Sequence, residues 1–199
     1  MAQRLHAQPL PLTVTPPAGH TVTLPAGHTV TRQGDPCFRA WIVATGALME
    51  RMVSLDGRVL IPRLPGPGDL IGGTDGGPSP VRVTTIRRTT LRPAAGRDLA
   101  EGLAARTRQA HAFVAEVVWL DTITTIELRL RQLAERFGRA APGGTAVGLT
   151  LTQEELGAFA GTTRESANRA VGELIRRGTI LRLSRGRYLV RAQLRSVDR

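Results

Sequence analysis

The 199-residue chain contains no lysine and only one cysteine, Cys37. A single thiol cannot form an intrachain disulfide or a four-thiolate metal cluster, so the sequence excludes a disulfide framework and fits a reducing compartment. We interpret Cys37 as a small, partly buried residue that follows a turn. The alternative is that its thiol acts as a redox sensor.

Long apolar runs are also missing. The most apolar stretch, residues 111–120, is interrupted by Glu116 and is too short to cross a bilayer. The first residues lack the apolar segment of a secretory signal. We therefore expect a cytoplasmic protein that makes no membrane contact.

The charge is strongly positive, because 27 basic residues, all of them arginine, face 16 acidic ones, which gives a net charge of +11. Arginine recognises phosphates and guanine edges through paired hydrogen bonds. The charge favours a nucleic-acid partner, although an anionic membrane surface would attract the same charge.

The first half of the sequence is typical of short strands and turns, since twelve of the thirteen prolines precede residue 97. Asp56-Gly57 predicts a hairpin turn, because glycine tolerates the positive φ that such turns need. The candidate strands are Val22–Leu24, Trp41–Val43, Leu48–Ser54, Arg58–Leu64 and Val81–Ile86.

An eight-residue repeat, Pro-Ala-Gly-His-Thr-Val-Thr-Leu/Arg, covers residues 17–24 and 25–32. Two copies are too few for a solenoid, so we interpret them as successive turn-plus-strand units of a β-roll or jelly-roll. The repeat places His20 and His28 at equivalent positions, but no third ligand lies at a useful spacing. We therefore predict two strand histidines and no metal site.

A helical pattern follows from about Asp98 to Phe137, and we predict one long helix there, about 30 residues in length. It carries two apolar stripes. One stripe is expected to meet the same helix of a second subunit as a coiled coil, and the other to pack against the chain's own neighbouring domain. The alternative is that both are intramolecular core. Gly138 and Pro142-Gly143-Gly144 are expected to end the helix and supply a hinge. The proposed dimer stripe is Phe113, Val117, Leu120 and Thr124; the second is Ile123, Ile126, Leu130, Leu133 and Phe137.

Residues 149–193 predict a winged helix-turn-helix. Two capping boxes, Thr152-Gln-Glu-Glu155 and Thr162-Thr-Arg-Glu165, are expected to open two short helices. Gly161 supplies the turn between them, and Gly178 ends the second helix near Arg177. Thr179–Leu183 and Tyr188–Arg191 then form a hairpin, the wing, around Ser184-Arg-Gly-Arg187.

The outward face of the second helix carries groups that can read base pairs. Arg164 and Arg169 can each grip guanine O6 and N7, and Glu165 can accept from cytosine N4. Hydroxyl groups at Thr152, Thr163 and Ser166 stand at helix starts, where phosphates bind. Arg185 and Arg187 in the wing could clamp the flanking backbone. The alternative is a solvated charged face used for protein contacts.

This order of parts resembles the cyclic-AMP receptor protein/FNR (CRP/FNR) family of transcription regulators. The resemblance runs from Leu24-Pro-Ala-Gly27 through Arg32-Gln-Gly-Asp35, Gly66-Pro-Gly-Asp-Leu70 and Leu133-Ala-Glu-Arg136 to the wing. Its most specific part is Arg164-Glu165-Ser-Ala-Asn168-Arg169.

The resemblance implies a homodimer that binds palindromic duplex DNA with TGTGA-like half-sites and that works with RNA polymerase. It also implies an α+β architecture: a β-roll sensory domain (residues 1–97), a dimerisation helix region (98–138) and a winged helix-turn-helix (139–199). The expected DNA-contacting residues are Thr152, Thr163, Arg164, Glu165, Ser166, Asn168, Arg169, Arg185 and Arg187.

The sensory domain departs from the family pattern. Cyclic-nucleotide binders carry Gly-Glu and, several residues later, Arg-Ser; here Gly73 replaces the glutamate, no Arg-Ser appears and the segment is shortened. Ala110-His111 stands where the resemblance would place Thr-Ser. A buried cyclic phosphate would lack a counter-charge. We therefore expect no control by cyclic AMP and no bound cofactor.

Other interpretations remain open. The β-roll could sense an unrecognised effector, redox change or haem, with Cys37, His111, His20 or the Gly72–Gly77 loop as candidate sensors. The cysteine cluster of iron–sulfur members is absent. An enzyme is not expected, because no nucleophile–base pair and no ligand cluster is evident. A protein-binding adaptor would show no salt-dependent binding to DNA.

Overall fold

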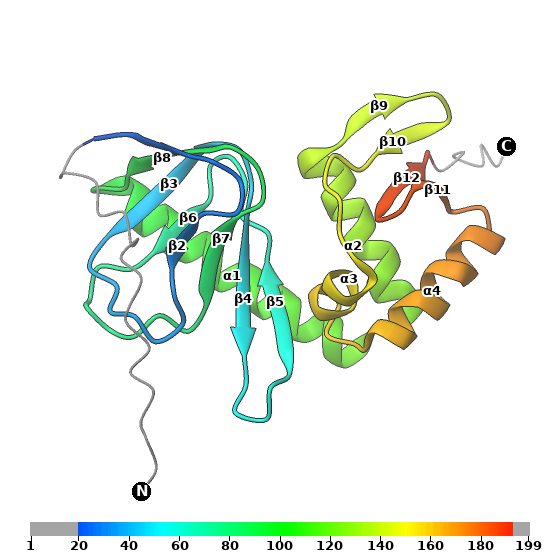
Figure 1. Cartoon of the computed structure of the whole chain (residues 1–199), viewed down its shortest axis with the longest axis horizontal. Coiled ribbons are helices and arrows are strands. Elements are labelled where there is room, and N and C mark those ends of the chain that lie inside the picture. The colour runs from blue at the N-terminus through cyan, green and yellow to red at the C-terminus, as the bar shows by residue number, and fades with distance from the viewer. Residues whose placement is uncertain (1–19, 193–199) are drawn as a thin grey trace, which may run out of the picture.

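The computed structural model describes residues 20–192, which fold into a strand-rich half and a helix-rich half joined by a long helix (Figure 1). Eight strands make up the first half. They are β1 (Val22–Leu24), β2 (Thr29–Thr31), β3 (Ala40–Thr45), β4 (Leu48–Val53), β5 (Val59–Arg63), β6 (Leu70–Gly72), β7 (Arg82–Thr85) and β8 (Thr89–Pro93).

These strands form two antiparallel sheets, with the orders β1-β8-β3-β6 and β2-β7-β4-β5. Side chains from both sheets share one core, for example Val43 of β3, Leu48 of β4 and Leu91 of β8. This arrangement is a two-layer β-roll, and β3 is buried on both faces, with Trp41 and Val43 in the core between the sheets and Ala40 and Ile42 in a second cluster with Leu99 of the following helix. The predicted strand-rich half is confirmed, and the two repeat units contribute β1 and β2. The Asp56-Gly57 hairpin joins β4 to β5, with Gly57 at φ 81°.

The prediction of a single long helix is wrong, because this part of the chain forms two helices. Helix α1 spans Arg97–Trp119 and α2 spans Thr122–Phe137. Leu120 between them is extended, and Asp121 caps α2 by accepting hydrogen bonds from the backbone N–H groups of Ile123 (2.8 Å) and Thr124 (3.0 Å). Because an N-cap residue has non-helical backbone angles, the capped start of α2 cannot continue α1.

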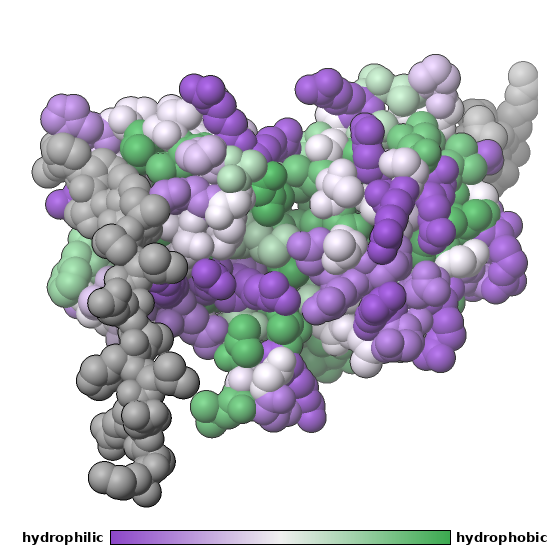
Figure 2. Space-filling view, in the orientation of Figure 1, coloured by the Kyte–Doolittle hydropathy of each residue, from purple (hydrophilic) through white to green (hydrophobic). Residues whose placement is uncertain are grey.

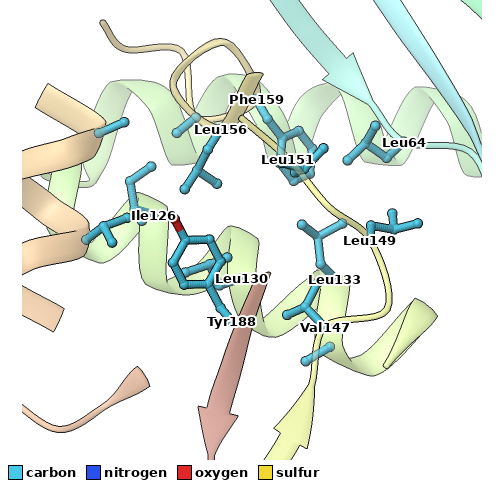
Figure 3. Close-up of a cluster of buried hydrophobic side chains, with 14 of the residues drawn as sticks. Leu64, Ile126, Leu130, Leu133, Val147, Leu149, Leu151, Leu156, Phe159 and Tyr188 are labelled. Carbon is cyan, nitrogen blue, oxygen red and sulfur yellow. The ribbon is translucent and has the colours of Figure 1, made fainter. Parts of the chain in front are cut away.

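The second stripe of the prediction is confirmed as the buried face of α2. Ile126, Leu130, Leu133 and Phe137 are buried, and Ile123 packs against them. Figure 3 shows Ile126, Leu130 and Leu133 among Leu156, Phe159 and Tyr188 from the last part of the chain. Leu64, which follows β5, joins the same cluster, so this core also reaches the β-roll.

The segment after α2 is not the predicted hinge. Arg139–Ala141 (β9) and Gly144–Ala146 (β10) form a hairpin, and β10 pairs with a strand of the wing. The remaining elements are α3 (Gln153–Phe159), α4 (Arg164–Arg176), β11 (Ile180–Ser184) and β12 (Arg187–Arg191). The sheet order is β11-β12-β10-β9, so the wing is part of a four-stranded sheet rather than an isolated hairpin.

Candidate nucleic-acid interface

Helix α3 begins with the predicted capping box. The backbone N–H of Glu155 donates to the Thr152 hydroxyl (3.1 Å), and the backbone N–H of Thr152 donates to a Glu155 carboxylate oxygen (2.8 Å). The second capping box is wrong. Helix α4 is capped by Thr163, not Thr162, and the hydroxyl of Thr163 accepts from the backbone N–H of Ser166 (3.2 Å).

A tight turn links α3 to α4 at Gly161, whose φ of 66° lies in the left-handed region, as predicted. The position has a second constraint. A β-carbon there would lie 3.0 Å from a methyl carbon of Val117, so the end of α1 packs directly against this turn. Both requirements favour glycine.

The inner face of α4 is made of small and apolar residues, Ala167, Ala170, Val171 and Leu174, all of which are buried. Its outer face carries Arg164, Glu165, Asn168 and Arg169, all of which are exposed. These positions form two adjacent pairs four residues apart, so they share one side of the helix. Figure 2 shows hydrophilic residues gathered over α3 and α4.

Two hydrogen bonds order the start of this face. Arg169 donates from Nη2 to the Ser166 hydroxyl (3.1 Å), and that hydroxyl lies 3.2 Å from the hydroxyl of Thr163. Ser166 is half-buried, and its hydroxyl already has hydrogen-bond partners within this segment, whereas Thr163 and Arg169 are exposed. The guanidinium of Arg169 is held toward the N-terminal end of α4.

The wing lies beside the start of α3. Gly186 has a φ of 74°, and a β-carbon there would lie 2.6 Å from the carbonyl oxygen of Leu151. The backbone N–H of Leu151 donates to the Gly186 carbonyl (3.1 Å), and the Gln153 side chain bonds the Tyr188 hydroxyl. These contacts hold exposed Arg185 and Arg187 next to the helix-turn-helix.

A cavity of about 380 Å³ opens between the wing turn and the starts of α3 and α4. It brings together three of the predicted residues: Thr152, Arg164 and Arg185. Arg187, Asn168 and Arg169 lie outside it. Sequence reasoning missed Gln153 and Thr150 in its lining, although the place of Gln153 directly after the cap was a usable signal.

A second cavity, of about 330 Å³, lies in the β-roll beside α1. Cys37, Gly73, Asp75 and Arg106 line it together with apolar side chains. Arg106 donates from Nη1 to the Gly72 carbonyl (2.9 Å). Cys37 is partly buried, as predicted.

The four residues of the predicted dimer stripe do not share one face. The Phe113 ring faces the chain's own Arg129, and Val117 packs against Gly161. Leu120 lies in the break, and Thr124 is on α2, where its hydroxyl donates to Asp121 (3.0 Å). The apolar residues that α1 exposes most near its end are Val114 (60%), Val118 (68%) and Trp119 (81%). The helix break explains the change, because it ends the continuous stripe at residue 119.

Comparison with known proteins agrees with this geometry. The Crp-like helix-turn-helix domain matches residues 126–197. A CRP-like cAMP-activated global transcriptional regulator of Mycobacterium tuberculosis is 31% identical in an alignment of 165 positions, which covers 74% of this chain and 74% of the relative. The chain belongs to the CRP/FNR family.

Solved CRP/FNR structures share the fold. A CRP/FNR family transcriptional regulator from Thermus thermophilus superposes with a TM-score of 0.76 at 25% identity, over 87% of this chain and 94% of its own. FixK2 from Bradyrhizobium japonicum gives 0.74 at 19% identity, over 88% and 93%. The helix-turn-helix match and the mycobacterial relative show that the chain belongs to a family of DNA-binding transcription regulators, which are not enzymes. Within residues 20–192, no helix has the length and apolar character needed to span a membrane.

Proposed function

We propose that the protein acts as a homodimer on palindromic DNA, and that α4 reads TGTGA-like half-sites in the major groove. The observation that carries the proposal is that α4 has two different faces. Ala167 and Ala170 are buried on one face. Arg164, Glu165 and Arg169 are exposed on the other, beside the wing. A helix held by small residues can project its outer face deep into a groove.

Each polar group on this surface has a role suited to its chemistry. Arg164 and Arg169 each donate two hydrogen bonds to guanine, and Glu165 accepts from cytosine N4. Four further side chains position the protein on phosphates or on neighbouring base edges, and they are Thr152, Thr163, Ser166 and Asn168.

The wing arginines supply affinity without sequence preference. Changing Arg185 or Arg187 to alanine is expected to weaken binding to matched and scrambled duplexes alike and to reduce the slope of log K against log salt by about 1. Gel-shift titrations over a series of salt concentrations measure this. Arg58→Ala, an exposed arginine near the β4–β5 turn, is the control and should change neither quantity. A loss confined to the matched duplex would contradict the phosphate role.

The dimer would form along α1. Thr107, His111, Val114 and Val118 follow one another at spacings of four, three and four, and each is exposed. This is the spacing of a coiled-coil seam. A two-fold dimer places its two recognition helices about one DNA turn apart, and RNA polymerase is the expected further partner.

Control by cyclic AMP is not part of the proposal, although the mycobacterial relative is described as cAMP-activated. Of the described residues that line the β-roll cavity, Arg106 is the sole arginine, its Nη1 already donates to Gly72, and Asp75 adds a negative charge. A cyclic phosphate would meet the carboxylate of Asp75 beside this single arginine, one of whose N–H donors is already used.

We expect no change in melting temperature with cyclic AMP and full DNA binding without any effector. Thermal-shift and gel-shift titrations check this with the same preparation. A saturable rise in melting temperature with cyclic AMP would show that the cavity accepts the nucleotide.

The second candidate is gating by a different effector in the same cavity. Its volume of about 330 Å³ and its apolar lining, which includes Leu70, Val83 and Leu103, favour this interpretation. Thermal-shift titration with haem, oxidants and small apolar compounds separates the two candidates, and Cys37→Ser tests whether the thiol takes part.

A further inference from the structure

A buried arginine on α2 connects three helices. Arg129 is 4% exposed. The central carbon of its guanidinium lies 4.8 Å from the centre of the Phe113 ring on α1 and 4.9 Å from that of the Phe159 ring on α3. The charged group therefore lies against two aromatic rings, one from the long helix and one from the helix-turn-helix.

Polar contacts fix the same group to α1. Arg129 Nη1 lies 2.7 Å from a carboxylate oxygen of Glu116 and donates to the side-chain oxygen of Gln132 (3.0 Å). Gln132 donates in turn to the other oxygen of Glu116 (3.3 Å). The three side chains form a closed network that links α1 to α2.

This network is not an efficient source of stability. Arg129 Nε and Nη2 are buried without a hydrogen-bond partner. Burial lowers the pKa of Arg129, and the nearby Glu116 carboxylate only partly opposes this. Replacing a buried ion pair by well-packed apolar residues is often neutral or stabilising. An apolar residue would not restrict how the three helices are oriented relative to one another. A planar guanidinium that lies against two rings and forms an ion pair does restrict their orientation.

The network lies across the break between α1 and α2. Only Leu120 and Asp121 separate α1 from α2, and Leu120 is extended, so rotation there would swing the whole helix-turn-helix. On the α1 side, Phe113 and Glu116 point to this network, whereas Val114 and Val118 stay exposed. One helix thus serves two contacts, an inner one to its own DNA-binding half and an outer one available to a second subunit.

We propose that Arg129 is a positioning residue that holds α4 at a set angle to α1 and so fixes the half-site spacing that the dimer accepts. This inference rests on the proposed function, since spacing has meaning only for a dimer on a palindrome. One added base pair rotates a half-site by about 35° about the DNA axis, because a turn holds about 10–10.5 base pairs. A rigid pair of recognition helices discriminates strongly between such sites.

The test replaces the buried pair by uncharged side chains, in the double variant Glu116→Gln/Arg129→Met. The affinity of this variant is measured for palindromes that differ by one or two base pairs in spacer length. The ratio of its affinity for the best spacer to its affinity for the other spacers is then compared with the same ratio for the wild-type protein. We expect this ratio to fall about tenfold. The melting temperature should equal or exceed that of the wild-type protein.

A purely structural role predicts a different result, with a lower melting temperature and equal losses on every spacer. Arg131→Met is the matched control, because Arg131 lies two residues away on α2 and pairs with Glu127 of the same helix (2.6 Å). It should leave the spacer ratio unchanged. Phe113→Leu removes one ring and keeps the ion pair, so it gives a second, independent measurement of the ratio.

Failure of the proposed function and failure of the role of Arg129 give different results. If the wild-type protein binds palindromes no better than scrambled duplexes, the proposed function fails. If the wild-type protein shows a spacer preference and the folded double variant and Phe113→Leu both keep it, the role of Arg129 is overturned.

Discussion

Changing Arg164 or Arg169 to alanine should cost about 1–3 kcal/mol of discrimination between the matched half-site and a scrambled one, or roughly 5- to 150-fold in relative affinity. Both guanidinium groups are exposed on the outer face of α4. Each would form two hydrogen bonds to one guanine, and alanine leaves the acceptors O6 and N7 without a donor. Binding to non-specific DNA should fall far less, since a single charge is lost.

The measurement is a pair of gel-shift titrations, on the selected palindrome and on a scrambled duplex of the same length and salt. Arg176→Ala is the matched control. Arg176 is exposed on the last turn of the same helix and pairs with Glu173, so its removal changes the charge of α4 by the same amount far from the base-reading end. Equal losses on both duplexes for Arg164→Ala would refute base reading.

The DNA-binding half was predictable because its signals are local. A capping box at Thr152, a left-handed glycine at Gly161 and the apolar face of α4 each depend on residues within one or two turns. The second cap was misplaced by one residue, at Thr162 instead of Thr163. Adjacent threonines offer the same hydroxyl, so the spacing of residues alone does not tell which of the two caps the helix.

Features that depend on distant partners were not predictable in this way. The β9–β10 hairpin was expected to be a hinge, because its glycines resemble a linker; it is ordered by pairing of Thr145 with Val190 of β12. The break at Leu120 was missed because the apolar spacing continues across it. An aspartate followed by threonine at 121–122 is the local signal that could have revealed it.

A substitution on the proposed dimer face of α1 gives the other large expected effect, on oligomeric state and DNA affinity. Val118→Glu places a carboxylate on the exposed face of α1, where the side chain is 68% exposed, so the single subunit should still fold. In a two-fold dimer the same residue from each subunit lies near the axis, and two buried carboxylates would repel. We expect a monomer by light scattering and a loss of about 10²- to 10⁴-fold in affinity for the palindrome, since the second half-site no longer benefits from the first.

Leu55→Glu supplies the matched control, because Leu55 is a fully exposed apolar residue in the turn that joins β4 to β5 and is not part of α1. It makes the same change in charge and hydrophobicity and should leave both the oligomeric state and the affinity intact. Because Arg164, Glu165 and Arg169 are untouched in Val118→Glu, its binding to an isolated half-site should match that of the wild-type protein. A variant that stays dimeric would move the interface off this face of α1, and a wild-type protein that is monomeric at micromolar concentration would remove the dimer from the proposal.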